Sequence, residues 1–234
     1  QHAVSTLGST VARVKGRVRA MKGTMSGGTL ASFKETMAAA GRDRSLIGIL
    51  RNPFALTSGF EGAEQPLGNQ PEYDEALQSW VAPFVMASIN TKNVHRSNML
   101  LGHSYGENFV YDEMMVTGPG DKGEAIAKAV TDDTSMAKSS LQPGEGPSKE
   151  ERENGLYDVL MVGEHTDGRS GRISVKGDRD PGYGSTSKMI AESAVCLVKH
   201  PDIGSGGIWT TAPIMGAELI ERLRANAGLT FTIE

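Results

Sequence analysis

The chain has 234 residues, of which 38% are hydrophobic and 22% charged, so its composition is that of an ordinary globular protein, and we expect a single domain over residues 1–234. Its net charge of −4 gives no general attraction to nucleic acid or anionic lipid, and no apolar run approaches the roughly 20 residues that span a bilayer. One cysteine, Cys196, excludes an internal disulfide and favours a reducing compartment, so we expect a cytoplasmic protein, with peripheral contact at a membrane left open.

The first element is a strand with a basic face. In "ARVKGRVRAM" small and apolar residues alternate with Arg13, Lys15, Arg17 and Arg19, which predicts a strand over 12–20 with one buried and one solvated face. The basic face could steer phosphates, or it could be solvated or paired with acidic neighbours. No aromatic residues lie between these cations to stack bases, so we expect no nucleic-acid partner.

Helices and loops follow. Thr29 is the predicted N-cap of a helix that ends at Gly41, and Gly, Pro and Asn make 52–71 an irregular loop. "EYDEALQSW" and the segment after it are predicted to be helical, with Pro83 in a first turn. A strand over 108–116, a helix over 122–130 and one helical turn after Ser148 come next.

The clearest local structure is a hairpin over 156–177 around Asp167-Gly168, a common turn pair. A helix is predicted after it, and this helix carries Met189, Ile190, Ala194, Leu197 and Val198. An amphipathic helix up to Gly228 and a last strand close the chain. Because regular βα alternation is absent, we expect an α+β fold, a mixed and largely antiparallel sheet with helices packed on it.

"GYGSTS", residues 182–187, comes within one residue of a dinucleotide-binding fingerprint. That fingerprint requires a parallel βαβ unit, whereas here the incoming strand is the second arm of a hairpin, and Asp178 and Asp180 would repel phosphate. The loop is therefore not predicted to bind a nucleotide. It could still bind another anion with the free N–H groups of the helix start, or Thr186 could simply cap the helix after a turn.

"MSGGTLAS" leaves a similar choice. Gly27 and Gly28 before a helix could admit a ligand against the backbone, or they could only form a tight turn. The five histidines are scattered, so no metal site is expected, and Cys196 has apolar neighbours, so it is predicted to lie in the core.

Six segments together resemble one family. They occur in the expected order between Arg17 and Leu229: "KGTMSGGTLAS", "APFVMASINTKNVHRSN", "YGENFVYDE", "PGEGPSKEER", "GDRDPGYGSTSKMIAESAVCL" and "GGIWTTAP…LIERL". This series is similar to saccharopine dehydrogenase-like oxidoreductases, in the branch that includes the trans-acting enoyl reductases. That family begins with a Rossmann domain that holds NAD(P), and no such sequence is present here. The resemblance therefore implies the catalytic, substrate-facing domain, which usually forms a homodimer, with its Rossmann domain expected upstream of residue 1.

The resemblance also implies roles for individual residues. Ser26, Gly27, Gly28 and Thr29 match a motif expected to face the cofactor. Arg96, Ser97 and Asn98 match an "RSN" element, in which Arg96 would bind an anionic or carbonyl-bearing group of the substrate. Asp180 and Thr186 would complete the substrate pocket, and Tyr183 or Lys188 would deliver a proton opposite the hydride.

The expected function is hydride transfer between NAD(P) and a C=C, C=N or C=O bond of a small, possibly lipid-like, molecule. Two alternatives remain: a stand-alone binding or dimerisation module without catalysis, and one half of a split enzyme that receives its Rossmann domain from another chain.

Overall fold

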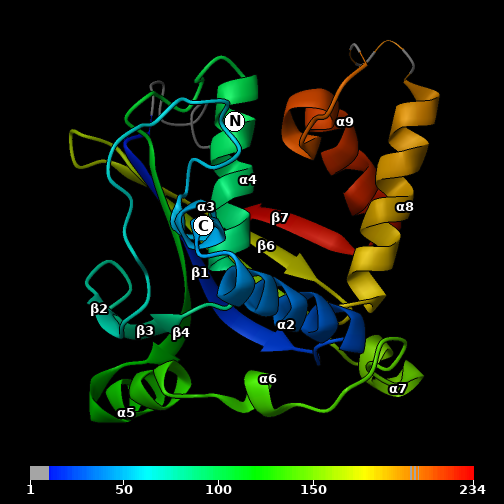
Figure 1. The fold of residues 1–234 in the computed structure, drawn as a ribbon. Helices are drawn as coiled ribbons and strands as arrows, with labels where there is room; N and C mark the ends of the chain where they lie inside the picture. Colours follow the sequence, from blue (N-terminus) through cyan, green and yellow to red (C-terminus); the bar gives the residue numbers. More distant parts are fainter. Residues whose placement is uncertain (1–10, 201, 203, 205) are drawn as a thin grey trace.

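The computed structural model describes residues 11–200, 202, 204 and 206–234, which form a mixed sheet with helices packed against it (Figure 1). Within this part of the chain the strands form one seven-stranded sheet in the order β2-β3-β4-β1-β5-β6-β7. The strands are β1 (Arg13–Lys22), β2 (Glu72–Asp74), β3 (Ser79–Pro83), β4 (Val110–Gly118), β5 (Leu156–Glu164), β6 (Ser170–Gly177) and β7 (Leu229–Ile233). The helices are α2 (Gly27–Arg42), α3 (Ser45–Arg51), α4 (Ala87–Leu100), α5 (Gly120–Thr131), α6 (Ser135–Lys138), α7 (Lys149–Glu153), α8 (Gly184–Lys199) and α9 (Thr211–Asn226).

The predicted fold class is confirmed. β1 runs parallel to β4, and each of the other neighbouring strand pairs in the described sheet is antiparallel. The hairpin of β5 and β6 turns at Asp167-Gly168 as predicted, and Gly168 has the positive φ of 87° that a glycine adopts without strain.

The predicted helix over 72–80 is wrong, because this segment is the hairpin of β2 and β3. The Asp74 carboxylate accepts hydrogen bonds from the backbone N–H groups of Ala76 and Leu77 and so stabilises a turn where a helix would otherwise continue. Across the hairpin Tyr73 packs edge-to-face on Trp80, with ring centroids 5.8 Å apart. Pro83 consequently ends β3, and α4 begins only at Ala87.

The helix predicted after the β5–β6 hairpin is confirmed as α8, but only some of its apolar residues are buried. Cys196 is fully buried, as predicted, and packs with Met215 and Leu219 of α9. Ile190, Leu197 and Val198 are instead exposed, since the side of α8 that carries Cys196 is the one that faces α9. The helix therefore presents an apolar row to its surroundings.

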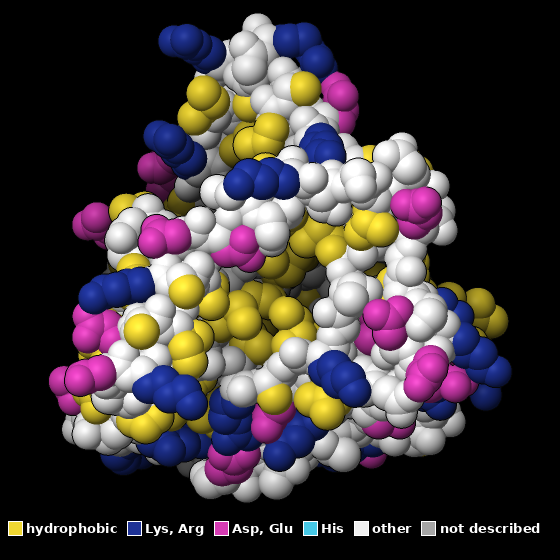
Figure 2. All heavy atoms as spheres, turned by 90° about the horizontal axis from the view of Figure 1, so that it is seen from below, with side chains coloured by type: hydrophobic (Ala, Val, Ile, Leu, Met, Phe, Trp, Pro, Cys, Tyr) yellow, Lys and Arg dark blue, Asp and Glu magenta, His cyan; other side chains and the backbone are white. Residues whose placement is uncertain are grey.

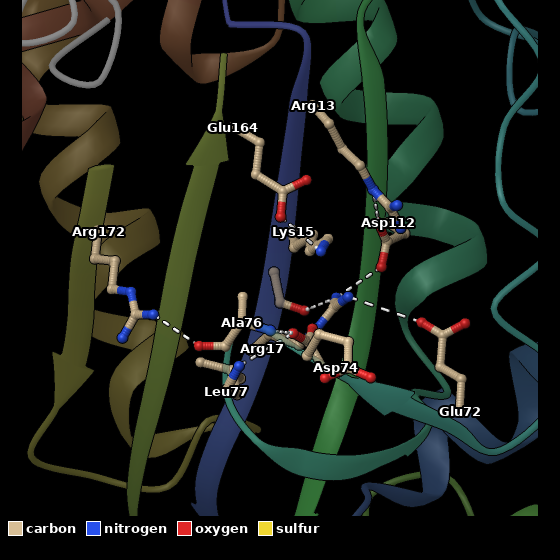
Figure 3. A network of polar contacts seen from close by, with 12 residues as sticks. Arg13, Lys15, Arg17, Glu72, Asp74, Ala76, Leu77, Asp112, Glu164 and Arg172 are labelled. Atoms are coloured by element: carbon tan, nitrogen blue, oxygen red, sulfur yellow. Dashed lines mark hydrogen bonds and ion pairs between the residues drawn. The ribbon is translucent and has the colours of Figure 1, made fainter. Parts of the chain in front are cut away.

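The basic face of β1 is not solvated. Figure 3 shows Arg17 between two carboxylates: its Nε donates to Asp74 at 2.8 Å, and Nη1 donates to Asp112 at 2.6 Å. Arg17 is fully buried, and both aspartates are buried with it. The neighbouring cations are paired as well, Arg13 with Asp112 and Lys15 with Glu164. The sequence left three possibilities for this face: steering phosphates, contact with solvent, or pairing with acidic neighbours. The structure shows the pairing.

Arg17, Asp74 and Asp112 form a group that we call the Arg17 cluster. It holds the turn between β2 and β3 against β1. One oxygen of Asp74 binds Arg17 and the other binds the turn, while Arg172 of β6 donates to the carbonyl of Ala76 at 2.8 Å (Figure 3). Burial by itself would raise the pKa of Asp74, but the hydrogen bond and charge of Arg17 lower it below its usual value. The cluster thus links an edge of the sheet to its centre.

Replacing Arg17 by methionine removes the cation and leaves two buried carboxylates without it. We expect Arg17→Met to lower the free energy of unfolding by about 3–5 kcal/mol, the usual cost of breaking a buried ion pair. Urea unfolding followed by circular dichroism measures the change. The matched control is Arg42→Met, which breaks the exposed pair with Glu35 and should cost less than about 1 kcal/mol. Equal losses in the two variants would contradict this account.

Candidate functional site

The helices cover one face of the sheet. From that side Asn90 of α4 donates to Glu113 of β4, and Ser185 of α8 hydrogen-bonds Tyr157 of β5. Phe231 of β7 lines a pocket with residues of α9. Because side chains alternate along a strand, this face is the one opposite to the Arg17 cluster.

The middle of this helical face is left partly uncovered. In the central strands β5 and β6 apolar side chains of this face are only half-buried, whereas Leu160 and Val162 on the other face are fully buried. Figure 2, from the side on which α5, α6 and α7 lie, shows a hollow with hydrophobic side chains on its walls and charged ones around it. We call the half-buried residues of β4, β5 and β6 the apolar floor: Met115, Val159, Met161, Ile173 and Val175.

One acid lies beside the apolar floor. Glu113 pairs in register with Gly16 of β1, which pairs with Met161 of β5 and so continues to Ile173 of β6. Gly16 leaves room for the Glu113 side chain, because a Cβ on residue 16 would lie 2.8 Å from Glu113 Cγ and 3.3 Å from the Tyr111 hydroxyl. The Tyr111 hydroxyl donates to Glu113 Oε1 at 2.5 Å, and Asn90 donates to Oε2 at 2.8 Å.

Sequence reasoning missed this acid. The run "YDE" within a strand otherwise made of apolar residues was the available signal, since a strand places Asp112 and Glu113 on opposite faces. Asp112 meets two arginines on its face, while Glu113 has only neutral donors. The partners, which decide the different chemistry of the two acids, are far away in the sequence.

The start of α2 carries the residues predicted to face the cofactor. Ser26, rather than Thr29, is the N-cap, and its hydroxyl accepts from the Thr29 N–H at 3.0 Å. Gly27 is buried, and a Cβ on it would overlap the backbone of Gln142. Gly28 is exposed, and a Cβ there would meet only Ser26 Oγ, at 3.8 Å. Gly27 therefore serves the packing of the chain, and Gly28 is open to a ligand.

The start of α8 is closed by the chain itself. The buried carboxylate of Asp180 accepts from the N–H groups of Gly182, Tyr183 and Gly184 at 3.0, 3.0 and 2.5 Å. The N–H groups that could have bound an anion are thus occupied, and a negative charge lies where a phosphate would have to bind. Thr186 does not occupy the N-cap position, which is Tyr183; its hydroxyl donates to the carbonyl of Pro181.

These two helix starts lie side by side. A Cβ on Gly23 would lie 2.7 Å from the Pro181 ring, and one on Gly146 would lie 2.9 Å from the Tyr183 ring and 3.9 Å from Ser26. Figure 1 likewise shows α2 and α8 beginning near each other, close to α7. Tyr183 is exposed, and Lys188 Nζ lies 3.9 Å from Asp178. Ser26 and Tyr183 are therefore close to each other, and the two predicted segments begin side by side.

The "RSN" residues lie elsewhere and have structural partners. Arg96 donates to the carbonyls of Leu56 and Ile208, at 2.9 and 2.8 Å, and Ile208 belongs to the connection that leaves the far end of α8. Ser97 bonds the carbonyl of Asn93 and the hydroxyl of Thr210. Asn98 bonds two adjacent residues of the loop after α4: it accepts from the Tyr105 N–H and donates to the Gly106 carbonyl. The substrate role expected for these three residues stays a prediction.

Two further properties concern the described residues as a whole. No group of three or more His, Cys, Asp or Glu side chains among them is arranged to hold a metal ion. No helix in the described ranges has the length and apolar character needed to cross a bilayer.

Comparison with curated proteins gives relatives that share one kind of name. The chain is 34% identical to "Putative trans-acting enoyl reductase Rv2449c" of Mycobacterium tuberculosis (strain H37Rv) over 236 residues, which cover 89% of this chain and 56% of that protein. It is 30% identical over 227 residues to a "Trans-acting enoyl reductase" of Mycobacterium bovis (strain BCG / Pasteur), covering 85% and 54%. A protein of the same name from Mycobacterium ulcerans is 29% identical over 226 residues, again covering 85% and 54%.

The chain spans about half the length of the curated relatives it matches. No protein-family model and no solved structure matches it. The predicted similarity to trans-acting enoyl reductases is thus confirmed, and the wider saccharopine dehydrogenase-like assignment stays a prediction.

Removing the Asp180 carboxylate leaves three N–H groups at the start of α8 without their acceptor. We expect Asp180→Ala to lower the free energy of unfolding by about 1–3 kcal/mol, as for other buried donors that lose a partner. Urea unfolding checks the value. Asp178→Ala, which removes an exposed carboxylate two residues earlier, is the matched control and should change stability by less than about 0.5 kcal/mol. A loss no larger than that of the control would show that the loop does not depend on Asp180.

His95 predicts a dependence of stability on pH. It is buried against the ring of Phe54, Nε2 has no hydrogen-bond partner in the described structure, and burial lowers its pKa to about 4. In the unfolded chain the His95 side chain takes up a proton near pH 6.5, whereas in the folded chain it stays neutral. The free energy of unfolding therefore has its full value above that pH and falls as the pH decreases towards 4. The expected slope is at most about 1.4 kcal/mol per pH unit.

Urea unfolding of His95→Phe between pH 7 and pH 4 tests this, because the variant should lose that slope. His200→Gln, at a half-exposed position, should keep it. A slope that is unchanged in His95→Phe would assign the acid sensitivity to other groups.

Proposed function

We propose that this chain is the substrate-facing part of an oxidoreductase that reduces the C=C bond of an enoyl group. The observation that carries the proposal is the similarity, over 85–89% of this chain, to proteins named trans-acting enoyl reductases. The apolar floor supports it, since an acyl chain is recognised mainly by the burial of its hydrocarbon. A saccharopine dehydrogenase-like family and the use of NAD(P) belong to the same proposal.

Of the two glycine-rich helix starts, the start of α2 has room for a nicotinamide cofactor and the start of α8 does not. At Gly28 the exposed backbone of a helix start has space for another part of the cofactor, such as a phosphate, and Ser26 and Thr29 bring hydroxyl groups beside it. At Gly182 and Gly184 the Asp180 carboxylate excludes a phosphate. When bound, the cofactor would supply the hydride, and we propose that a Rossmann domain outside this chain holds most of it.

The remaining work of the reaction falls to this chain. The apolar floor would orient the acyl chain and keep water from it, which is how a binding site converts affinity into rate. Tyr183 and Lys188 begin the helix next to the proposed cofactor residues and are candidates to contact the substrate. Arg96 and Ser97 would act less directly, through the connection that ends in Thr210, and Asn98 through the loop that holds Tyr105 and Gly106.

The exposed apolar row of α8 is suited to pack against a protein partner. Ile190, Leu197 and Val198 lie on one side of the helix, at the spacing by which helices pack on other proteins. A homodimer, with the Rossmann domain attached, is the partner set we propose.

The native full-length protein tests the function directly. With NADPH and a 2-enoyl thioester, we expect NADPH oxidation that depends on the thioester and yields the saturated acyl group, followed by absorbance and mass spectrometry. Gly28→Val should weaken NADPH binding about tenfold in a fluorescence titration, because the valine side chain fills the space proposed for the cofactor.

The matched control is Gly41→Val at the other end of the same helix, where a Cβ meets nothing within 4 Å. It should bind NADPH like the wild type. Absence of thioester reduction would exclude the proposed function, and equal binding by both variants would exclude Gly28 from the cofactor site.

A further inference from the structure

The helical face holds a carboxylic acid at the border of the apolar floor. Glu113 shares its cross-sheet row with Met161 and Ile173, and the glycine between them leaves no side chain in the way. The close distance from Gly16 to Glu113 Cγ shows that the Glu113 side chain lies over β1, on the way to the floor. An acid at this place borders the surface proposed for the acyl chain.

The surroundings of Glu113 are unusual for a buried carboxylate. Its two oxygens accept from Tyr111 on its own strand and from Asn90 on α4, and no ion pair found in the described part of the chain includes it. On the opposite face, by contrast, Asp112 and Asp74 share Arg17. The charge that acts on the pKa of Glu113 is that of Asp112, of the same sign.

These surroundings favour the neutral acid. Burial raises the pKa of Glu113 above its usual value, and the charge of Asp112 raises it too, while the hydrogen bonds from Tyr111 and Asn90 lower it less. A carboxylic acid with a raised pKa, next to an apolar surface, is suited to donate a proton near neutral pH.

We propose that Glu113 is the proton donor of the site, with Tyr111 and Asn90 as positioning residues. The inference rests on the proposed function. In the reduction, the bound cofactor would supply a hydride to the alkene carbon remote from the thioester, and the C=C electron pair would move to the carbon next to the carbonyl. That carbon takes the proton of the Glu113 carboxyl group. Water then returns a proton to the carboxylate.

The test compares Glu113→Gln with the wild type in the native full-length protein, with NADPH and a 2-enoyl thioester as probes. Glutamine keeps the shape and a hydrogen-bond acceptor but cannot donate this proton. We expect kcat to fall about 10²–10⁴-fold, the range for loss of a general acid, while the KM for thioester and NADPH changes little. The wild-type kcat should decrease as the pH rises through the pKa of Glu113, and the variant should lack this decrease.

The matched control is Glu164→Gln, which removes a carboxylate from β5 on the opposite face, where it pairs with Lys15, and should keep the wild-type rate and pH profile. An infrared difference spectrum gives a reading without turnover: the wild type should show a protonated carboxyl band that Glu113→Gln lacks. If the wild type reduces the thioester and Glu113→Gln does so equally well, the proton donor is another group and the proposed function stands. If the wild type does not reduce it at any pH, the function and the donor role both fail.

Discussion

The structure depends on two adjacent residues in the central strand β1. Gly16 and Arg17 necessarily point to opposite faces of the sheet. Arg17 is buried with Asp74 and Asp112 and ties the turn of the β2–β3 hairpin to the centre of the sheet. Gly16 leaves the other face open, so that Glu113 can lie across the strand next to the apolar floor. One face is thus closed by charge pairing, and the other is left partly uncovered.

The two glycine-rich helix starts illustrate how similar motifs acquire different tasks. At α8 the Asp180 carboxylate takes up the free N–H groups, so the loop is a self-capped turn that stabilises the fold. At α2 the cap is a neutral serine, and Gly28 remains exposed. We propose that the charge of the capping group decides which of these two helix starts can bind an anionic or dipolar part of a cofactor.

Much of the fold could be predicted from sequence, because alternation and turn residues are local signals: β1, the β5–β6 hairpin and α8 were all expected. The β2–β3 hairpin was missed because Asp74 and the Tyr73–Trp80 pair override a helical composition. The exposure of the apolar row of α8 could not be predicted, because periodicity shows an apolar side of a helix but not what packs against it. Glu113 could not be identified as part of the site, since its role follows from Gly16, Asn90 and Tyr111 meeting in three dimensions.

The central claim is that the helical face of this sheet receives the acyl chain, with Glu113 at its border and Gly28 towards the cofactor. A crystal structure of the native full-length protein with NADPH and a non-reducible acyl thioester tests it most directly. The account predicts the hydrocarbon against Met161 and Ile173 and the carbon next to the thioester within reach of the Glu113 carboxyl group. An acyl chain bound on the Arg17 face, or a nucleotide phosphate at Gly182 and Gly184, would contradict it.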